Sequence, residues 1–279
     1  MSSIWSEGTR CAASLTFDVD GEAGVLQVNP GSSNSLSALS WARYGPKVGC
    51  DRILNLLRDR EVKATFFFPG YTAELYPKLV ERVFAEGHEV GVHGYLHEKV
   101  SDLTSEQEEE VLVRTIDILT NITGHRPVGY RAPLWDLNLD SPELLARHGL
   151  LYDSSLMEDD KPYFLSTTTK PLVELPVHWT NDDWEQFAYL LDPAIGSGVI
   201  ETCEKAHQLW KEEFDGMYRY GGAFILTMHP EITGRPARVM WLERLIDHIQ
   251  SHEGVWLTTC EEIARFALSK AAPQMALTH

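Results

Sequence analysis

The sequence has few cysteines and lacks any hydrophobic run that approaches the length of a membrane span. Its four cysteines are far apart and form no CxxC pair. This spacing favours reduced, mostly buried thiols over a disulfide framework or a thiolate metal site. The N-terminus, MSSIWSEGTRC, has no basic segment followed by an apolar one, as a secretory signal would. We therefore expect a soluble protein of the cytoplasm.

Basic residues are also scarce. The 24 Lys and Arg residues face 41 Asp and Glu residues, which gives a formal net charge of −17. Nucleic acids and anionic membranes carry charge of the same sign, so neither is expected as a partner. At 43% hydrophobic and 23% charged residues, the chain is otherwise ordinary globular material. A small molecule or a short saccharide is the partner class that remains.

Short apolar runs alternate with longer amphipathic stretches along the chain. We expect strands at 12–19, 63–68, 88–93, 127–131, 150–155, 172–178, 222–229 and 255–258. Helices are expected at 48–59, 74–86, 105–120, from 141 onward, 200–213 and 237–251. The alternation predicts an α/β protein with a parallel sheet covered by helices. Seven or eight such units favour one closed or nearly closed barrel over residues 1–270, with an open doubly wound sheet as the alternative, and 271–279 as a flexible tail.

Residues 23–46 are too long for an ordinary connection between a strand and a helix, which needs only about 2–6 residues. We therefore predict a long loop directly after the first strand. Its apolar and aromatic members are too many to leave in water as one patch. We expect this segment to fold over the site at the strand ends, to pack against another subunit, or both.

Polar residues follow several of the predicted strands at the ends where they would meet. In α/β barrels, catalytic groups gather at the carboxyl ends of the strands. The residues at those ends are Asp18, Asp20, His93, His97, Arg131 and His229. Alternation along a strand places Asp18 and Asp20 on one face, where two like charges need a positive neighbour. A divalent cation would supply that charge.

His93 and His97 strengthen the hypothesis of a metal site. They are four residues apart, so one helical turn would present both imidazoles to a single ion. With Asp20 they form a set of two nitrogens and one oxygen, which suits zinc and leaves a coordination position for water. The alternative is a solvated histidine pair at the start of a helix.

Four segments, in order, resemble the signature motifs of the polysaccharide deacetylase (NodB-homology) family: TFDVDG, GHEVGVHGYLH, YRAP and LTMHP. The similarity spans roughly residues 12 to 265. It implies a distorted (β/α) barrel with seven or eight units, a divalent metal that is usually zinc, and hydrolysis of an amide such as an N-acetyl group. It also implies that Asp20, His93 and His97 are the metal ligands.

The resemblance assigns the remaining roles as well. Asp18 matches the catalytic base, Arg131 the group that orients it, and His229 the general acid. The backbone N–H of Leu134 matches a donor to the oxyanion. Independently of the resemblance, Trp135 is a candidate wall of the pocket, with core packing as the alternative. In NDDW, either Asp182 or Asp183 is expected to keep the imidazole protonated.

The chain also departs from the common motifs. Val19 separates two acids that are usually adjacent, Gly94 replaces a Ser or Thr, and Leu134 with Trp135 replaces a Tyr. With RYGPKVGCDRIL and ELPVHWTNDDW, these differences resemble the subgroup of cyclic imide hydrolases, allantoinase-like enzymes and an intracellular peptidoglycan-deacetylase-like protein. That subgroup implies a homotetramer with a closed pocket for small substrates.

Two functional hypotheses follow. The first is a hydrolase of a non-peptide carbon–nitrogen bond, acting on a small cyclic amide or imide or on an acetamido sugar. The second is a catalytically silent barrel that binds a carbohydrate or amide. The silent barrel would be expected to lose its base or acid, whereas Asp18 and His229 are both present. Most histidines outside the motifs, including His248 and His252, are interpreted as surface or structural residues, with His178 near NDDW as a candidate for the pocket lining.

Overall fold

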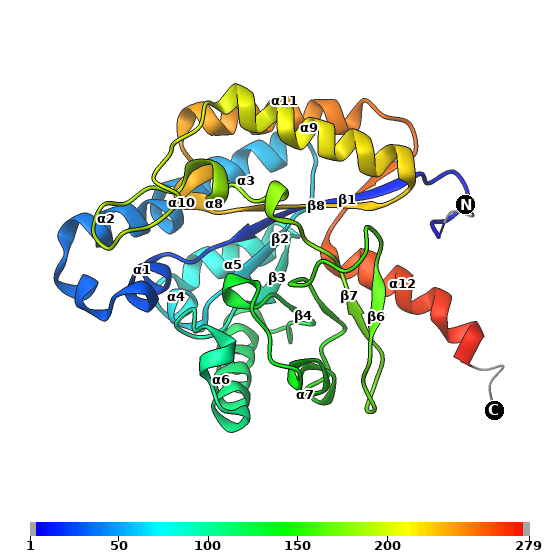
Figure 1. Ribbon diagram of the computed structural model, residues 1–279, viewed down its shortest axis with the longest axis horizontal. Coiled ribbons are helices and arrows are strands. Elements are labelled where there is room, and N and C mark those ends of the chain that lie inside the picture. The colour runs from blue at the N-terminus through cyan, green and yellow to red at the C-terminus, as the bar shows by residue number, and fades with distance from the viewer. Residues whose placement is uncertain (1–3, 276–279) are drawn as a thin grey trace.

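The protein is built on a nine-stranded sheet, seen in a computed structural model that describes residues 4–275 (Figure 1). The strands are β1 (Cys11–Asp18), β2 (Thr65–Phe68), β3 (Glu89–Val92), β4 (Gly129–Tyr130), β5 (Tyr152–Asp153), β6 (Tyr163–Leu165), β7 (Leu172–Glu174), β8 (Ala223–Met228) and β9 (Val255–Leu257). Every predicted strand is present. The short β6 was missed, because it pairs antiparallel to β7 at the edge of the sheet and is only partly buried.

The strand order is β6-β7-β5-β4-β3-β2-β1-β8, with β9 paired to the amino half of β1. All pairs except β6–β7 are parallel. Beyond β7 the chain returns to β8, where Asp182 forms a parallel bridge with Thr227. The Asp183 N–H also donates to the Thr227 carbonyl at 3.1 Å. The sheet therefore curls into a distorted (β/α) barrel, which confirms the predicted fold class.

Twelve helices surround the sheet in the described part of the chain. They are α1 (Glu22–Val28), α2 (Leu36–Tyr44), α3 (Cys50–Asp59), α4 (Gly70–Leu75), α5 (Pro77–Ala85), α6 (Ser105–Thr123), α7 (Ser141–Arg147), α8 (Trp184–Phe187), α9 (Cys203–Tyr220), α10 (Pro230–Thr233), α11 (Pro236–Gln250) and α12 (Cys260–Met275). In Figure 1, α9 and α11 lie together along one side of the barrel, and α6 and α7 lie near the opposite side.

The ends of α6 follow directly from its sequence. Thr104 accepts a hydrogen bond from the Gln107 amide, and the Gln107 side chain accepts one from the Thr104 amide. This reciprocal cap satisfies two amides that the first turn of a helix leaves free. At the other end Gly124 has a φ of 73°, a left-handed conformation that ends a helix at little steric cost. The helix predicted at 105–120 is therefore present and continues to Thr123.

The prediction of a loop at residues 23–46 was wrong. The segment contains α1, a 3₁₀ turn (Pro30–Asn34) and α2, followed by a π-helical turn (Gly45–Gly49) that leads into α3. Ser35 caps α2 by accepting a hydrogen bond from the Ala38 amide. The Glu22 carboxylate accepts a hydrogen bond from Arg43 at 2.8 Å, which ties the two helices together.

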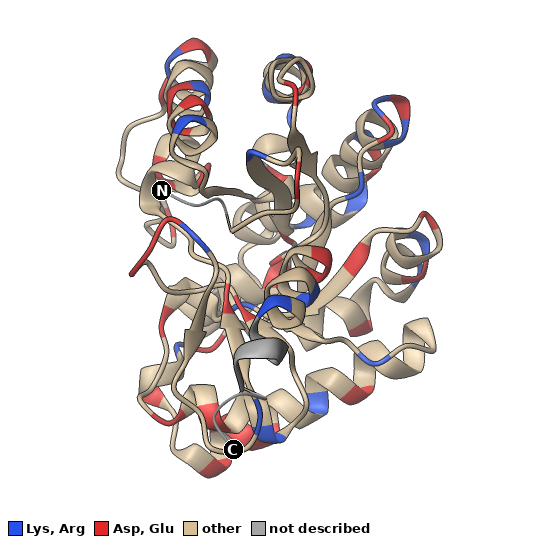
Figure 2. Ribbon diagram, turned by 90° about the vertical axis from the view of Figure 1, so that its right-hand side faces the viewer, with Lys and Arg blue, Asp and Glu red and all other residues tan. Residues whose placement is uncertain are grey.

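The C-terminal region is more regular than expected. Helix α12 runs to Met275, so part of the tail expected at 271–279 is helical, and residues 276–279 lie outside the described residues. No helix within residues 4–275 is both long and apolar enough to cross a membrane. Figure 2 shows most charged residues on the helices and loops around the sheet, while the strands are largely uncharged.

Candidate metal centre and active site

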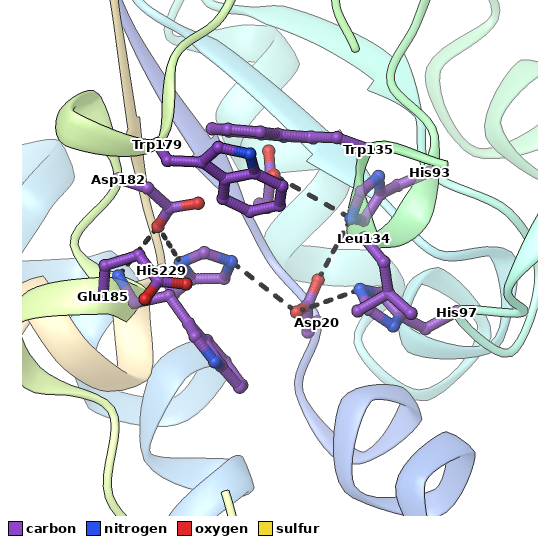
Figure 3. Close-up of a pocket in the computed structure, with 11 residues that line it drawn as sticks. Asp20, His93, His97, Leu134, Trp135, Trp179, Asp182, Glu185 and His229 are labelled. Atoms are coloured by element: carbon purple, nitrogen blue, oxygen red, sulfur yellow. Dashed lines mark hydrogen bonds and ion pairs between the residues drawn. The ribbon is translucent and has the colours of Figure 1, made fainter. Parts of the chain in front are cut away.

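A cavity of about 220 Å³ opens at the carboxyl ends of the strands. The residues that line it are Asp18, Asp20, His93, His97, Leu134, Trp135, Trp179, Asp182, Trp184, Glu185 and His229 (Figure 3). They come from the ends of β1, β3, β4 and β8 and from the segment after β7. The parallel sheet thus brings together side chains that are far apart in the sequence, as the strand-end argument predicted.

Three of these residues, Asp20, His93 and His97, form a group that we call the inner triad. The Asp20 carboxylate lies 3.5 Å from His93 Nε2 and 3.4 Å from His97 Nε2. His93 Nδ1 lies 2.7 Å from the Arg131 carbonyl, which can only accept a hydrogen bond. Nδ1 therefore carries the proton, and the Nε2 lone pair faces Asp20.

The inner triad fits a divalent metal. Its ligand atoms lie within 4.8 Å of one another, and all three residues are buried. Neither carboxylate oxygen of Asp20 has a hydrogen-bond partner among the described residues, which is costly for a buried acceptor. Burial lowers the pKa of His97 to about 4 and also lowers that of His93. Both imidazoles are therefore neutral, which is the form that binds a metal.

His97 joins the inner triad from a tight loop, where a helical turn was predicted. The helical turn predicted for His93–His97 is not formed, and His97 has a left-handed φ of 59°. The Glu98 carboxylate accepts hydrogen bonds from the amides of Tyr95 and Leu96, both at 2.9 Å. These bonds hold a tight loop in place of a helix. A non-glycine residue in this conformation is strained, and such strain is typical of functional sites.

Asp18 lies beside the triad and is paired with Arg131. Arg131 Nη1 donates to Asp18 Oδ1 at 2.9 Å and to Thr16 Oγ1 at 2.7 Å. Burial alone would raise the pKa of Asp18, but the charge of Arg131, with that of His229, holds it below its usual value. Asp18 is therefore an ionised carboxylate in the cavity wall.

The guanidinium of Arg131 is fully buried and is held from behind by β5 and the residues that follow it. Its Nε donates to the Ser154 carbonyl and its Nη2 to Ser154 Oγ, both at 3.0 Å. The guanidinium carbon also lies 4.4 Å from the centre of the Phe67 ring. These contacts leave Nη1 aimed at Asp18 and fix the direction of the pair.

A hydrogen-bond chain also fixes the backbone after Arg131. The Ala132 amide donates to Ser155 Oγ at 2.9 Å, and Ser155 Oγ donates to Asp153 at 2.8 Å. Glu174 accepts from the amides of Ser155 and Leu156, both at 2.9 Å. The carboxyl end of β4 is therefore anchored through β5 to β7. The sequence did not indicate this buried support.

His229 faces the triad from the opposite side, with its Nε2 3.9 Å from Asp20 Oδ2. Its Nδ1 lies 2.7 Å from Asp183 and 3.7 Å from Asp182. Asp183 also accepts a hydrogen bond from the His229 amide at 3.0 Å and another from Thr233. Of the two acids in NDDW, Asp183 is the direct partner of the imidazole.

These contacts determine the charge of His229. Burial disfavours the charged ring, but the hydrogen bond and charge of Asp183, with Asp182, raise the pKa of His229 well above its usual value. Asp182 lines the cavity and accepts a hydrogen bond from the Trp184 amide at 2.7 Å. Burial raises the pKa of Asp182 to about 7.

Aromatic side chains form the cavity walls. Trp135 and Trp179 pack with ring centroids 4.4 Å apart, and Trp184 meets His229 edge to face at 5.0 Å. Leu134 lines the same wall and is 46% exposed, with a left-handed φ of 59°. Trp179 was missed as a wall residue because it gains its role only by packing against Trp135.

The 23–46 segment contributes to the site indirectly. Among the described residues, none from this segment lines the cavity. Trp41 of α2 instead packs edge to face against Trp184, with ring centroids 6.1 Å apart. The segment therefore supports one cavity wall from behind and does not form a cover over the inner triad.

The chain is similar to several known proteins in sequence and in structure. Residues 43–152 match the family model for polysaccharide deacetylase. A Helicobacter pylori peptidoglycan deacetylase is 33% identical over 88% of this chain and 92% of its own length. The crystal structure of a Mycobacterium smegmatis protein assigned to the polysaccharide deacetylases is 41% identical, with a TM-score of 0.93 over 95% of this chain and 93% of that one.

The crystal structure of a Puue allantoinase is also similar. It is 26% identical, with a TM-score of 0.83 over 96% of this chain and 94% of that chain. Both the sequence match to the Helicobacter pylori enzyme and the structural matches extend over nearly the whole chain. The protein therefore belongs to the polysaccharide deacetylase family, whose members are hydrolases of carbon–nitrogen bonds other than peptide bonds.

Proposed function

We propose that this protein is a metal-dependent hydrolase of an amide-type carbon–nitrogen bond in a small molecule. The proposal rests on one observation: two charged pairs, Asp18–Arg131 and His229–Asp183, flank the inner triad in a single cavity. One pair holds a carboxylate that can accept a proton, and the other holds an imidazolium that can donate one. Hydrolysis of an amide needs both.

The inner triad would hold a divalent metal, with zinc favoured by its two imidazole nitrogens and one carboxylate. When bound, such an ion lowers the pKa of water and polarises a carbonyl. Asp18 then has the role of base. Its carboxylate is kept ionised by Arg131 and accepts the proton of the attacking water.

His229 has the role of acid. An amine leaves poorly unless its nitrogen is protonated, and Asp183 keeps the imidazolium charged until that transfer. The backbone N–H of Leu134 is proposed to donate to the oxyanion of the tetrahedral intermediate. Its left-handed turn lies in the cavity wall between β4 and the triad, so the donor is held by the chain that follows Arg131.

The size and walls of the cavity support a small substrate. Its volume of about 220 Å³ is below the roughly 300–1,000 Å³ of pockets for drug-sized ligands. The faces of Trp135 and Trp179 suit a planar or ring-shaped molecule. Among the relatives, one is a peptidoglycan deacetylase and one an allantoinase. We place a cyclic amide or imide slightly ahead of an acetamido sugar.

The test is a turnover screen of zinc-loaded protein on succinimide, dihydrouracil, allantoin and N-acetylglucosamine oligomers. We expect turnover of at least one of the small cyclic compounds, and a loss of about 10²–10⁴-fold in kcat for Asp18→Asn protein that retains its zinc. Turnover of the oligomers alone would overturn the preference for a cyclic substrate. Binding of these compounds without turnover by any zinc-loaded sample would favour the silent barrel.

We also propose that the protein assembles into an oligomer, with a tetramer suspected from the resemblance. Large apolar side chains on its surface support a subunit contact. Leu36 of α2 is 77% exposed and Leu191 is 78% exposed, and a subunit contact that covers such side chains removes their apolar surface from water. Sedimentation velocity measures the state, and a monomer over the whole range of concentrations would contradict the proposal.

A further inference from the structure

A second group with the donor set of the inner triad lies on the outside of the barrel. It consists of Asp215 on α9, His248 on α11 and His252 in the turn after α11, and we call it the outer triad. Helices α9 and α11 pack side by side (Figure 1). None of the three residues is among those that line the catalytic cavity.

The two imidazoles converge on one carboxylate oxygen. Asp215 Oδ1 lies 2.7 Å from His248 Nε2 and 3.7 Å from His252 Nε2. One ligand atom from each residue lies within 4.8 Å of the other two. Ligands around a zinc ion sit about 2.0–2.2 Å from the metal, so small side-chain rotations would let all three reach the same ion.

Hydrogen bonding fixes the tautomer of His252. Its Nδ1 lies 2.8 Å from the His248 carbonyl, which can only accept, so Nδ1 carries a proton. Nε2 is therefore the nitrogen that faces Asp215 and is available to a metal. A ligating histidine whose other nitrogen donates to a backbone carbonyl is the usual arrangement at metal sites in proteins. A simple His248–Asp215 ion pair would not require it.

Aromatic packing holds both rings in place. Phe214 meets the ring of His248 at 5.7 Å and that of His252 at 5.2 Å, each nearly edge to face. Tyr218 meets His252 at 4.8 Å. The side chains of His248 and His252 are 20% and 24% exposed. The ring positions are therefore restrained, while an ion can still enter from solvent.

We propose that the outer triad is a second divalent-metal site, separate from the catalytic cavity. Two imidazole nitrogens and one carboxylate favour zinc, copper or nickel over magnesium or calcium, which prefer oxygen ligands. A bound ion would connect α9 to the end of α11 and stabilise the folded protein by binding it in preference to the unfolded chain. Because the site is partly open to solvent, it binds metal more weakly than the buried inner triad.

The experiment is a zinc titration of the metal-free full-length protein, followed by calorimetry and elemental analysis. Wild type is expected to bind two ions per chain, and a His248→Ala/His252→Ala variant one. In a His93→Ala/His97→Ala background, one ion should remain and should raise Tm. Adding His252→Ala to that background should remove both the ion and the shift in Tm. Cobalt is a second probe, because its visible absorption reports coordination by imidazole.

A matched control is His207→Ala, which removes another histidine from α9 that packs against Trp241 outside the outer triad. It should keep two ions. If wild type and the His248→Ala/His252→Ala variant both bind one ion under excess zinc, the outer triad is an ion pair and the proposal is wrong. The proposal also fails if His248→Ala/His252→Ala protein, shown to be folded by circular dichroism, still binds two. Neither outcome bears on catalysis, because the inner triad is measured separately.

Discussion

The inner and outer triads contain the same residue types in different surroundings. Asp20 is buried, and its carboxylate oxygens have no hydrogen-bond partner among the described residues. Asp215 is 43% exposed and already lies 2.7 Å from His248. The inner group is flanked by two charged pairs, Asp18–Arg131 and His229–Asp183. An aspartate with two histidines is enough to bind a metal. Catalysis at such a site also depends on the charged groups next to it.

Removing ligands from the inner triad should have the largest effect. We expect His93→Ala and His97→Ala each to abolish turnover and to lower bound metal by one ion per chain, because each removes one of three ligands from a buried site. Elemental analysis and a turnover assay on the same samples check both results. If both variants kept full metal content, the inner triad would not be the site of binding.

Replacing Asp18, the proposed base, should have the next largest effect on turnover. Asp18→Asn is expected to lower kcat by about 10²–10⁴-fold, the range for losing a general base, while the metal content stays constant. Asp18 is paired with Arg131 at 2.9 Å and lies outside the inner triad, so we do not expect it to be a metal ligand. A variant that remained active would transfer the role of base to another group.

The two carboxylates near His229, Asp182 and Asp183, are expected to differ in their effect on kcat. Asp183→Asn should lower kcat by about 10–100-fold, because it removes a charged hydrogen bond worth about 1.5–3 kcal/mol from His229. Asp182→Asn is the matched control and should have a smaller effect, since its carboxylate lies 3.7 Å from the ring. Steady-state kinetics on both variants show which substitution lowers kcat more. Equal losses would mean that total negative charge matters more than the direct bond.

Much of the inner site could be predicted from the sequence, because strand periodicity placed Asp18 and Asp20 together at a carboxyl end. The backbone conformation that brings His97 to the inner triad could not be predicted. Its left-handed backbone depends on two hydrogen bonds to Glu98, which compete with the helix that the spacing suggested. The helix α2 was missed although Ser35, its N-cap, was visible in the sequence. Residues 23–46 were instead interpreted as one long loop, because their number exceeds that of an ordinary connection between a strand and a helix.

The outer triad was missed for a different reason. His248 and His252 are four residues apart, as are His93 and His97, but no strand end or family motif marked them. Asp215 joins them only through the packing of α9 on α11. Contacts between helices depend on tertiary structure, so periodicity within one helix does not reveal them. The sequence therefore predicted the site that the barrel topology organises and not the one formed by helix packing.

The smallest expected effect concerns Trp41, which supports the cavity wall next to His229, the proposed acid. Trp41→Ala should raise KM by about 2–10-fold with little change in kcat, because an edge-to-face aromatic pair is worth about 0.5–1.5 kcal/mol. Its loss frees Trp184, which packs on His229. Trp256→Ala is the control, since it removes a similar edge-to-face contact with Trp5, which is not among the cavity-lining residues. It should lower Tm without changing KM. If both variants raise KM equally, the effect of Trp41 reflects general stability, and α2 does not shape the cavity.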